Sequence, residues 1–208
     1  MGGVGVGVGN ASASTAYSVY VAICSAVRHR LGASSLQDVG IAVQGLGNVG
    51  SRLIELLSAK GAKLVVTDVD ADKLQGLPAE IKKVSTEEIY DQPAEVFAPC
   101  ALGAVINEHT LSRLKATVIA GGANNQLASP EIGEQLRHRQ ILYAPDYICN
   151  GGGIIELHYQ INGGTREALR EHLDSIDETL SAIFDRAEQE SLPTELVADR
   201  MTEALFKN

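Results

Sequence analysis

The stretch Gly40-Ile41-Ala42-Val43-Gln44-Gly45-Leu46-Gly47-Asn48-Val49-Gly50 decides the fold of this chain. Its apolar first half predicts a buried parallel strand, and the apolar spacing of the next seven residues predicts a helix. Between them lies the pattern G-x-G-x-x-G. Gly45 permits a tight turn, Gly47 leaves room for an anion beside the backbone, and Gly50 lets the helix pack closely on the strand. Because the free N–H groups of the helix start face the turn, the stretch predicts a pyrophosphate-binding site.

A second apolar segment, residues 63–67, ends at Asp68, which lies 18 residues after Gly50. A carboxylate at this distance can accept hydrogen bonds from both hydroxyls of an adenosine ribose. The glycine pattern alone is a weak signal and also fits an ordinary glycine turn. Here the strand, the helix and the acid supply the context that the motif requires. The sequence therefore predicts a site for a dinucleotide.

Size and composition narrow the class of protein. The 208 residues are 45% hydrophobic, which is enough for one packed core, and the net charge of −9 argues against a nucleic-acid partner. No apolar run has membrane-spanning length. The cysteines at 24, 100 and 149 lack metal-ligand spacing, so we interpret them as small buried side chains in a reducing cytoplasm. The five scattered histidines are interpreted as structural or surface residues, and no metal site is expected.

The rest of the chain alternates between the two kinds of periodicity. Further strands are expected near residues 81–84, 95–100, 117–120 and 141–144, and helices at 15–27, 108–114 and 132–139. This alternation predicts an α/β fold, a Rossmann-type doubly wound parallel sheet. From residue 166 onward the spacing is helical, with a break at Leu192-Pro193-Thr194 and Thr194 as a cap for the last helix. We expect these C-terminal helices to pack on the sheet domain.

Three regions follow from this pattern. Residues 1–9, MGGVGVGVG, are expected to be a flexible glycine-rich segment, or a hinge from a preceding domain. Residues 10–165 are expected to form the dinucleotide-binding domain, and residues 166–208 a helical extension of it. Small and polar residues gather just after the predicted strands, at the carboxyl edge where such sheets bind ligands.

Several of these motifs resemble one family in both sequence and order. Residues 10–20, NASASTAYSVY, resemble the segment N-P-S-P-x-T-A-Y-G-V-Y of the leucine, phenylalanine and valine dehydrogenases, which belong to the wider glutamate dehydrogenase family. Further matching segments are VQGLGNVG at 43–50, APCALGA at 98–104, ANNQL at 123–127, APDY at 144–147, N-x-G-G at 150–153 and ADRM at 198–201. The resemblance covers nearly everything after residue 9, and leucine dehydrogenase is the member that the motifs resemble most.

The resemblance implies an NAD-dependent oxidoreductase that deaminates an L-amino acid, such as leucine, to its 2-oxo acid. It also implies an oligomer for the full-length enzyme. The residues that it assigns to the cofactor are Gly45, Gly47, Asn48 and Val49 at the pyrophosphate, Asp68 at the adenosine ribose, Cys100, Ala101, Ala120 and Asn124 along the path to the nicotinamide, and Thr15 at its carboxamide. Asn150 is placed between the nicotinamide and the substrate. Ile154 and Leu157 would face the side chain of the amino acid.

Each assignment has a simpler alternative. Thr15 also fits a helix cap, and Asn124 and Asn125 fit turn positions. The run 150–153 fits a flexible loop, and Ile154 and Leu157 fit ordinary core positions.

The chain also departs from the family pattern. Ala11 and Ala13 replace two prolines and Ser18 replaces a glycine, which predicts a looser entry to the hinge. Glu156 places an acid near the expected aliphatic pocket and puts that pocket in doubt.

The resemblance places the catalytic lysine and aspartate, and a lysine that holds the substrate carboxylate, on an N-terminal domain. Only nine residues precede the match, so we expect no catalytic residue in this chain. Its lysines are expected on helix faces, strand starts, loops or the terminus, with none beside the nicotinamide. Two functions fit: the NAD-binding part of a dehydrogenase, served by a catalytic domain in trans, or a non-catalytic NAD(H)-binding regulatory or sensor module.

Overall fold

The computed structural model describes residues 11–206, so the glycine-rich segment predicted at 1–9 lies outside the described residues. The fold centres on a six-stranded sheet in the order β3-β2-β1-β4-β5-β6, and every pairing is parallel. The strands are β1 (Gly40–Gln44), β2 (Lys63–Thr67), β3 (Lys82–Lys83), β4 (Val96–Pro99), β5 (Val118–Ile119) and β6 (Leu142–Tyr143). The order reverses beside β1, which is the doubly wound arrangement that the sequence predicts.

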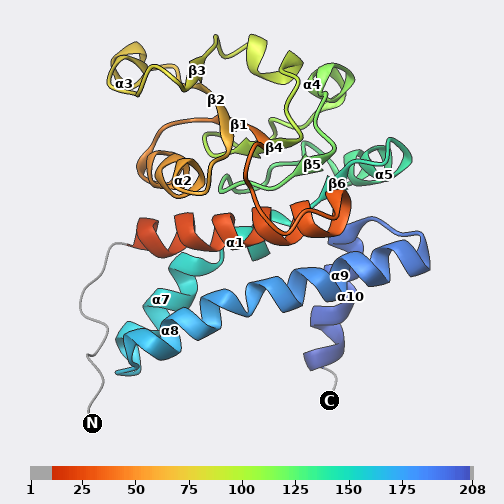
Figure 1. Ribbon diagram of the computed structural model, residues 1–208. Helices are drawn as coiled ribbons and strands as arrows, with labels where there is room; N and C mark the ends of the chain where they lie inside the picture. The colour runs from red at the N-terminus through yellow and green to blue at the C-terminus, as the bar shows by residue number, and fades with distance from the viewer. Residues whose placement is uncertain (1–10, 207–208) are drawn as a thin grey trace.

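Helices cover both faces of this sheet, with α1 and α2 on one side and α4 and α5 on the other (Figure 1). The elements that precede α6 are α1 (Ala11–Leu31), α2 (Asn48–Ser58), α3 (Ala71–Gln75), the 3-10 helix η1 (Glu88–Asp91), α4 (Glu108–Arg113) and α5 (Pro130–His138). The long apolar helix α1 begins at Ala11, four residues earlier than predicted, and ends at Leu31; the N–H of the next residue, Gly32, donates to the Arg28 carbonyl.

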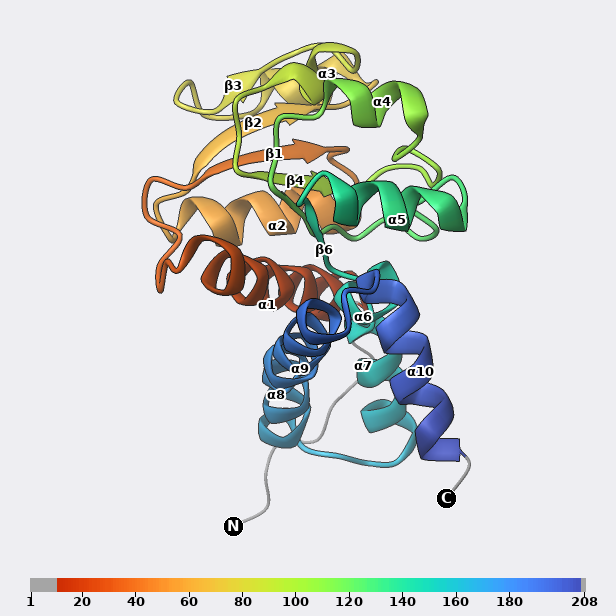
Figure 2. The same ribbon diagram turned by 90° about the vertical axis from the view of Figure 1, so that its right-hand side faces the viewer.

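The remaining helices lie on the far side of α1 from the sheet (Figure 2). They are α6 (Asp146–Cys149), α7 (Gly152–Ile161), α8 (Arg166–Asp174), α9 (Ile176–Glu190) and α10 (Thr194–Phe206). The prediction that C-terminal helices pack on the domain is confirmed, but most of their contact is with α1 and α7 and little is with the sheet. Thr194 is the first residue of α10, and its hydroxyl donates to the Tyr143 carbonyl of edge strand β6 at 2.6 Å.

Two buried clusters of apolar side chains, one on each face, hold the sheet in place. Ile41 and Val43 of β1 point into the cluster shared with α1 and α2, whereas Ala42 points into the cluster shared with α4 and α5. Because successive strand residues face opposite sides, Gln44 then follows Ala42 toward the α4 side. Residues 11–206 contain no helix long and apolar enough to cross a membrane.

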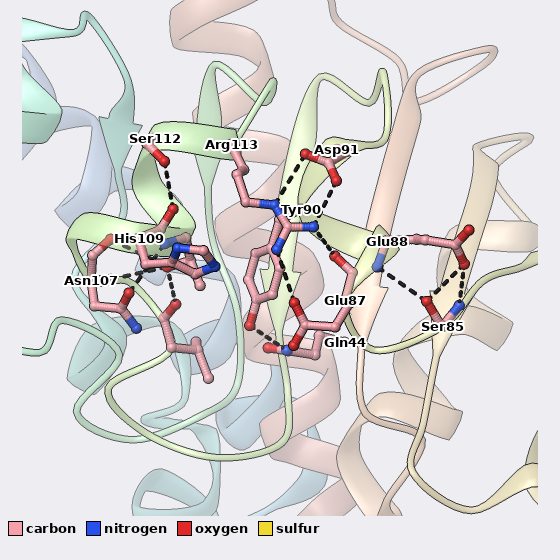
Figure 3. Close-up of polar contacts among 12 residues, drawn as sticks. Gln44, Ser85, Glu87, Glu88, Tyr90, Asp91, Asn107, His109, Ser112 and Arg113 are labelled. Carbon is pink, nitrogen blue, oxygen red and sulfur yellow. Dashed lines mark hydrogen bonds and ion pairs between the residues drawn. The ribbon is translucent and has the colours of Figure 1, made fainter.

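A polar network on that side anchors the end of β1. Gln44, the residue directly before Gly45, donates from Nε2 to the Tyr90 hydroxyl at 2.8 Å (Figure 3). Arg113 lies over the Tyr90 ring at 5.7 Å and donates to Glu87 at 2.9 Å and to Asp91 at 2.7 Å. These carboxylates raise the pKa of Arg113, so its charge is constant. The network ties η1 and α4 together beneath the strand end that carries the glycine turn.

Candidate functional site

The turn from β1 into α2 has the geometry that its glycines predict. Gly45 has a φ of +97°, in the left-handed region that favours glycine, and its N–H donates to the Thr67 carbonyl at 2.8 Å. A Cβ on Gly50 would collide with the Gly45 carbonyl, so the helix and the strand end are in direct contact. At Gly47, by contrast, an added Cβ would meet no atom within 4 Å. The turn is therefore closed on its inner side and open at Gly47.

The start of α2 faces this open space. Gly47 is the N-cap of α2 and no side chain caps the helix, so its first N–H groups have no acceptor within the helix. An open pocket lies between α2 and α3, and its lining residues are Leu46, Gly47, Asn48, Ser51, Arg52, Glu55 and Lys73. Free N–H groups at the positive end of a helix can bind an anion, and a bare Gly47 lets a phosphate approach them.

Asp68 follows β2 and contacts two residues that line this pocket, Leu46 and Lys73. Its Oδ2 accepts a hydrogen bond from the Leu46 N–H at 2.6 Å, and its Oδ1 accepts from the Asp70 N–H at 2.9 Å. The side chain is only 6% exposed, and the Lys73 ammonium lies 3.4 Å from Oδ1. Burial raises the pKa of this carboxyl, but the two N–H donors and Lys73 together outweigh burial and leave the pKa below its usual range. Asp68 is therefore a fixed anion at neutral pH.

The ends of β4 and β5 continue the same edge. Cys100 donates its N–H to the Gln44 carbonyl at 2.7 Å, and Ala101 lies directly against Gly45. Ala120 is fully buried at the end of β5. A Cβ on Gly122 would lie 2.9 Å from a Val49 methyl and 3.7 Å from the Cys100 sulfur. Burial raises the pKa of Cys100 to about 11, so this residue is a neutral thiol at physiological pH.

Two asparagines meet at the other end of the edge. The Asn150 amide donates to the Asn124 Oδ1 at 2.6 Å and also lies 3.4 Å from the Gly122 carbonyl. Asn150 and Gly151 form the turn that joins α6 to α7, and α7 begins at Gly152, so the loop alternative is wrong for residues 152–153. Thr15 lies in the first turns of α1. Its hydroxyl faces Gly153 so closely that a Cβ added to this glycine would lie only 2.9 Å from Thr15 Oγ1. The three polar side chains thus come from distant segments.

Comparison with known proteins gives the family. A sequence model of the Glutamate/Leucine/Phenylalanine/Valine dehydrogenases matches residues 7–72 and 67–202. The chain belongs to this dehydrogenase family.

Leucine dehydrogenase of Geobacillus stearothermophilus is 40% identical over 196 residues, which cover 93% of this chain and 53% of the relative. Valine dehydrogenase of Streptomyces coelicolor is 37% identical over 199 residues, with coverage of 93% and 55%. The crystal structure of L-tryptophan dehydrogenase from Nostoc punctiforme matches with a TM-score of 0.91 and 36% identity, over 95% of this chain and 61% of that chain. The chain thus spans about half the length of the curated relatives it matches.

Two dehydrogenase motifs that lie far apart in the sequence are in contact. Tyr147, from the APDY segment, donates its hydroxyl to Asp199 of the ADRM segment at 2.7 Å. This bond holds α10 against α6, just before Asn150. The C-terminal motif therefore supports the segment that carries Asn150.

The alternatives for Thr15, Ile154 and Leu157 are wrong. Thr15 lies inside α1 and donates its hydroxyl to the Ala11 carbonyl at 2.8 Å, so it is not a helix cap. Ile154 is 77% exposed and Leu157 is 53% exposed, so neither is a core residue. Glu156 is buried instead, and accepts a hydrogen bond from Gln160 at 3.1 Å. The acid therefore does not share the exposed apolar face of α7.

The structure agrees with some of the simpler interpretations of the asparagines, cysteines and histidines and disagrees with others. Asn125 has a φ of +51° and occupies a turn, as its alternative predicts. Cys149 is fully buried, but Cys24 and Cys100 are only partly buried. His29 packs on Phe184 and pairs with Glu188 at 3.0 Å, which fits a structural role. Within residues 11–206, no group of three or more potential ligands is placed to hold a metal ion.

Sequence reasoning missed three residues of the carboxyl edge. Val69 is 92% exposed directly after Asp68, and Leu102 is 76% exposed directly after Ala101. Large apolar side chains so exposed beside a polar site are typical of ligand contacts. Lys73 lies on the helix α3, and its ammonium reaches Asp68 at 3.4 Å. The sequence signal for this contact was that Lys73 follows Asp68 by five residues, with the helix N-cap Asp70 between them.

Proposed function

We propose that residues 10–165 form the NAD-binding domain of an L-amino-acid dehydrogenase, with residues 166–208 as its helical extension. The observation that carries this proposal is the joint geometry of Gly47 and Asp68. An uncapped helix start with open space at Gly47 fits a pyrophosphate, and an ionised carboxylate at the end of the next strand fits a ribose diol. Membership of the dehydrogenase family supports the assignment independently.

The remaining edge residues fit the rest of the dinucleotide. Val69 and Leu102 offer apolar contacts to an adenine, and Cys100, Ala101 and Ala120 present small side chains along the edge toward Asn124. The amides of Asn124 and Asn150 and the hydroxyl of Thr15 would orient the nicotinamide carboxamide and the substrate. Bound NAD would supply the hydride acceptor for the reaction. The protein residues described here would bind and orient it.

The substrate class we propose is a branched-chain L-amino acid, such as leucine, which gives ammonia and a 2-oxo acid. The supporting feature is the exposed apolar pair Ile154 and Leu157 on α7, next to Asn150. An aliphatic side chain would pack against this pair, whereas a carboxylate side chain would gain nothing there. The relatives named leucine and valine dehydrogenase support the same class.

We further propose that proton transfer requires groups outside residues 11–206. None of the lysines in this range lies beside Asn124 or Asn150 in any hydrogen bond or ion pair of the structure. The catalytic groups would come from the domain that makes up the other half of the relatives' length. By family resemblance the complete enzyme would be an oligomer, and the Thermus thermophilus glutamate dehydrogenase of the same fold is described as hetero-hexameric.

Calorimetric titration of the chain with NADH tests the binding proposal, and absence of binding would refute it. A second experiment joins the chain to a family N-terminal domain and measures NADH formation with a panel of L-amino acids. Turnover with leucine, isoleucine or valine would support the dehydrogenase assignment. Tight NADH binding without turnover of any amino acid would favour the non-catalytic regulatory module instead.

A further inference from the structure

Lys73 lines the pocket between α2 and α3 but has no role in the proposed binding of the dinucleotide. It lies on α3, opposite the start of α2, and forms part of the pocket wall with Arg52 and Glu55. Its ammonium is 3.4 Å from Asp68 Oδ1, and its side chain is 44% exposed while that of Asp68 is 6% exposed. Lys73 is therefore a half-exposed cation beside a buried anion.

Asp68 does not depend on Lys73 for its position. Two backbone N–H groups, from Leu46 and Asp70, already bind its two oxygens at 2.6 and 2.9 Å. An ion pair of a half-exposed lysine at 3.4 Å is weak, because water screens it and the side chain loses rotamer freedom. The ammonium can thus leave Asp68 at little cost and pair with another anion within its reach.

The expected position of the ribose beside Asp68 decides which anion could come near Lys73. If Asp68 accepts hydrogen bonds from the ribose hydroxyls, a phosphate on the 2′-oxygen would lie between Asp68 and the pocket wall formed by α3. Asp68 repels such a group, which carries about −1.5 to −2 charges at neutral pH. A lysine offers a compact charge on a flexible stem and needs no fixed geometry to pair with a phosphate.

We propose that Lys73 sets how strongly the site discriminates against a 2′-phosphate. This inference rests on the proposed dinucleotide function. With Lys73 present, the site retains part of its affinity for NADPH although Asp68 opposes it. Lys73 is a specificity-determining residue, because its ammonium is the cation held next to the ribose-binding carboxylate. Arg52 lines the same pocket on α2 but has no ion pair with Asp68 in the structure.

The test is calorimetric titration of the complete chain and its variants with NADH and with NADPH. Lys73→Gln should weaken NADPH binding about fivefold, the effect of one partly exposed charge pair, and leave NADH binding nearly unchanged. Lys73→Arg keeps the charge and should keep most of the NADPH affinity. Asp68→Asn should strengthen NADPH binding, and adding Lys73→Gln should remove much of that gain.

Matched controls separate a local pair from general electrostatics. Lys63→Gln removes the same charge from the amino end of β2, where Lys63 pairs with Asp38 at 3.0 Å, and should leave the NADPH affinity unchanged. The inference is overturned if Lys73→Gln leaves the NADPH affinity intact, or if Lys63→Gln or Arg52→Gln lowers it as much as Lys73→Gln does. Failure of the unmutated chain to bind NADH would instead overturn the proposed function, and this inference with it.

Discussion

The hydroxyl oxygen of Ser18 lies 2.6 Å from the carbonyl oxygen of Cys149. This hydrogen bond joins α1 to the end of α6, one residue before Asn150. Ser18 is fully buried, and its oxygen also accepts the Gly152 N–H at 3.2 Å. The replacement of a family glycine by Ser18 predicted a looser entry to the hinge. That looser entry stays a prediction, because residues 1–10 lie outside the described residues; within them, the serine binds the segment that carries Asn150.

Ser18→Ala should lower the free energy of unfolding by about 1–3 kcal/mol, because it leaves two buried backbone groups without their side-chain partner. Chemical denaturation followed by circular dichroism measures this difference. Ser25→Ala is the matched control on α1, since Ser25 is equally buried but makes only long contacts, at 3.3 Å to the Asp177 carbonyl and 3.4 Å to the Ser181 hydroxyl. An effect of Ser18→Ala no larger than that of Ser25→Ala would contradict the prediction.

Gly47 and Gly50 should respond differently to added side chains. Gly47→Val places a branched side chain in the open space at the start of α2, and should weaken NADH binding by more than about tenfold, or roughly 1.4 kcal/mol. The fold should survive, because a Cβ at this position meets no atom within 4 Å. Gly50→Ala should instead lower stability, since its Cβ collides with the Gly45 carbonyl. Unchanged NADH binding by a folded Gly47→Val variant would mean that the dinucleotide binds elsewhere.

NADH should bind clearly more tightly than NADPH. The ionised Asp68 accepts hydrogen bonds from ribose hydroxyls and repels a 2′-phosphate, and its low pKa keeps it ionised. Asp68→Ala should narrow the difference between the two affinities, as measured by calorimetry. Equal affinities in the unmutated chain would refute the role given to Asp68.

Asp68 should also contribute to stability in a pH-dependent way. Because its pKa in the folded state is lowered, its contribution is complete above the unfolded-state pKa and is lost as the pH falls through the folded-state pKa. The unfolding free energy of the unmutated chain should therefore exceed that of Asp68→Asn at neutral pH. The difference should shrink below about pH 4, near the ordinary pKa of an aspartate. Denaturation curves of both proteins at several pH values measure it, and a difference that grows toward acid pH would contradict the assignment.

The chain alone should bind NADH but deaminate leucine, valine, isoleucine or phenylalanine only at background rates. Asn150 and Thr15 can orient a nicotinamide, but general acid–base assistance, typically worth about 10² to 10⁴ in rate, needs a proton-transferring group, and no lysine of residues 11–206 pairs with either side chain. Loss of a lysine that holds the substrate carboxylate would remove positioning as well. A spectrophotometric assay of NADH formation checks this, and a family N-terminal domain added in trans is the positive control. Ordinary enzyme rates from the single chain would show that one of its own lysines reaches the site.

The sequence by itself determined the fold and the positions of the glycine turn and Asp68. The glycines at 45, 47 and 50 and the acid at 68 are separated by fixed numbers of residues within one strand–helix–strand unit. Local geometry therefore fixes their relative positions, and the structure agrees with the prediction there. The strands after Asp68 were also predictable, because buried parallel strands are short, apolar and followed by small or polar residues.

Only the tertiary structure decided what lies at the other end. Thr15 precedes both Asn124 and Asn150 by more than a hundred residues, and no local rule brings the Asn124 and Asn150 side chains within 2.6 Å of each other. The apolar spacing of the sequence also could not decide which side chains of α7 are exposed. Ile154 and Leu157 have the spacing of core residues, but they lie on the uncovered face of this helix. Lys73 is the clearest case. A flexible side chain on a helix can point in many directions, and only the tertiary structure shows that its charge lies 3.4 Å from Asp68.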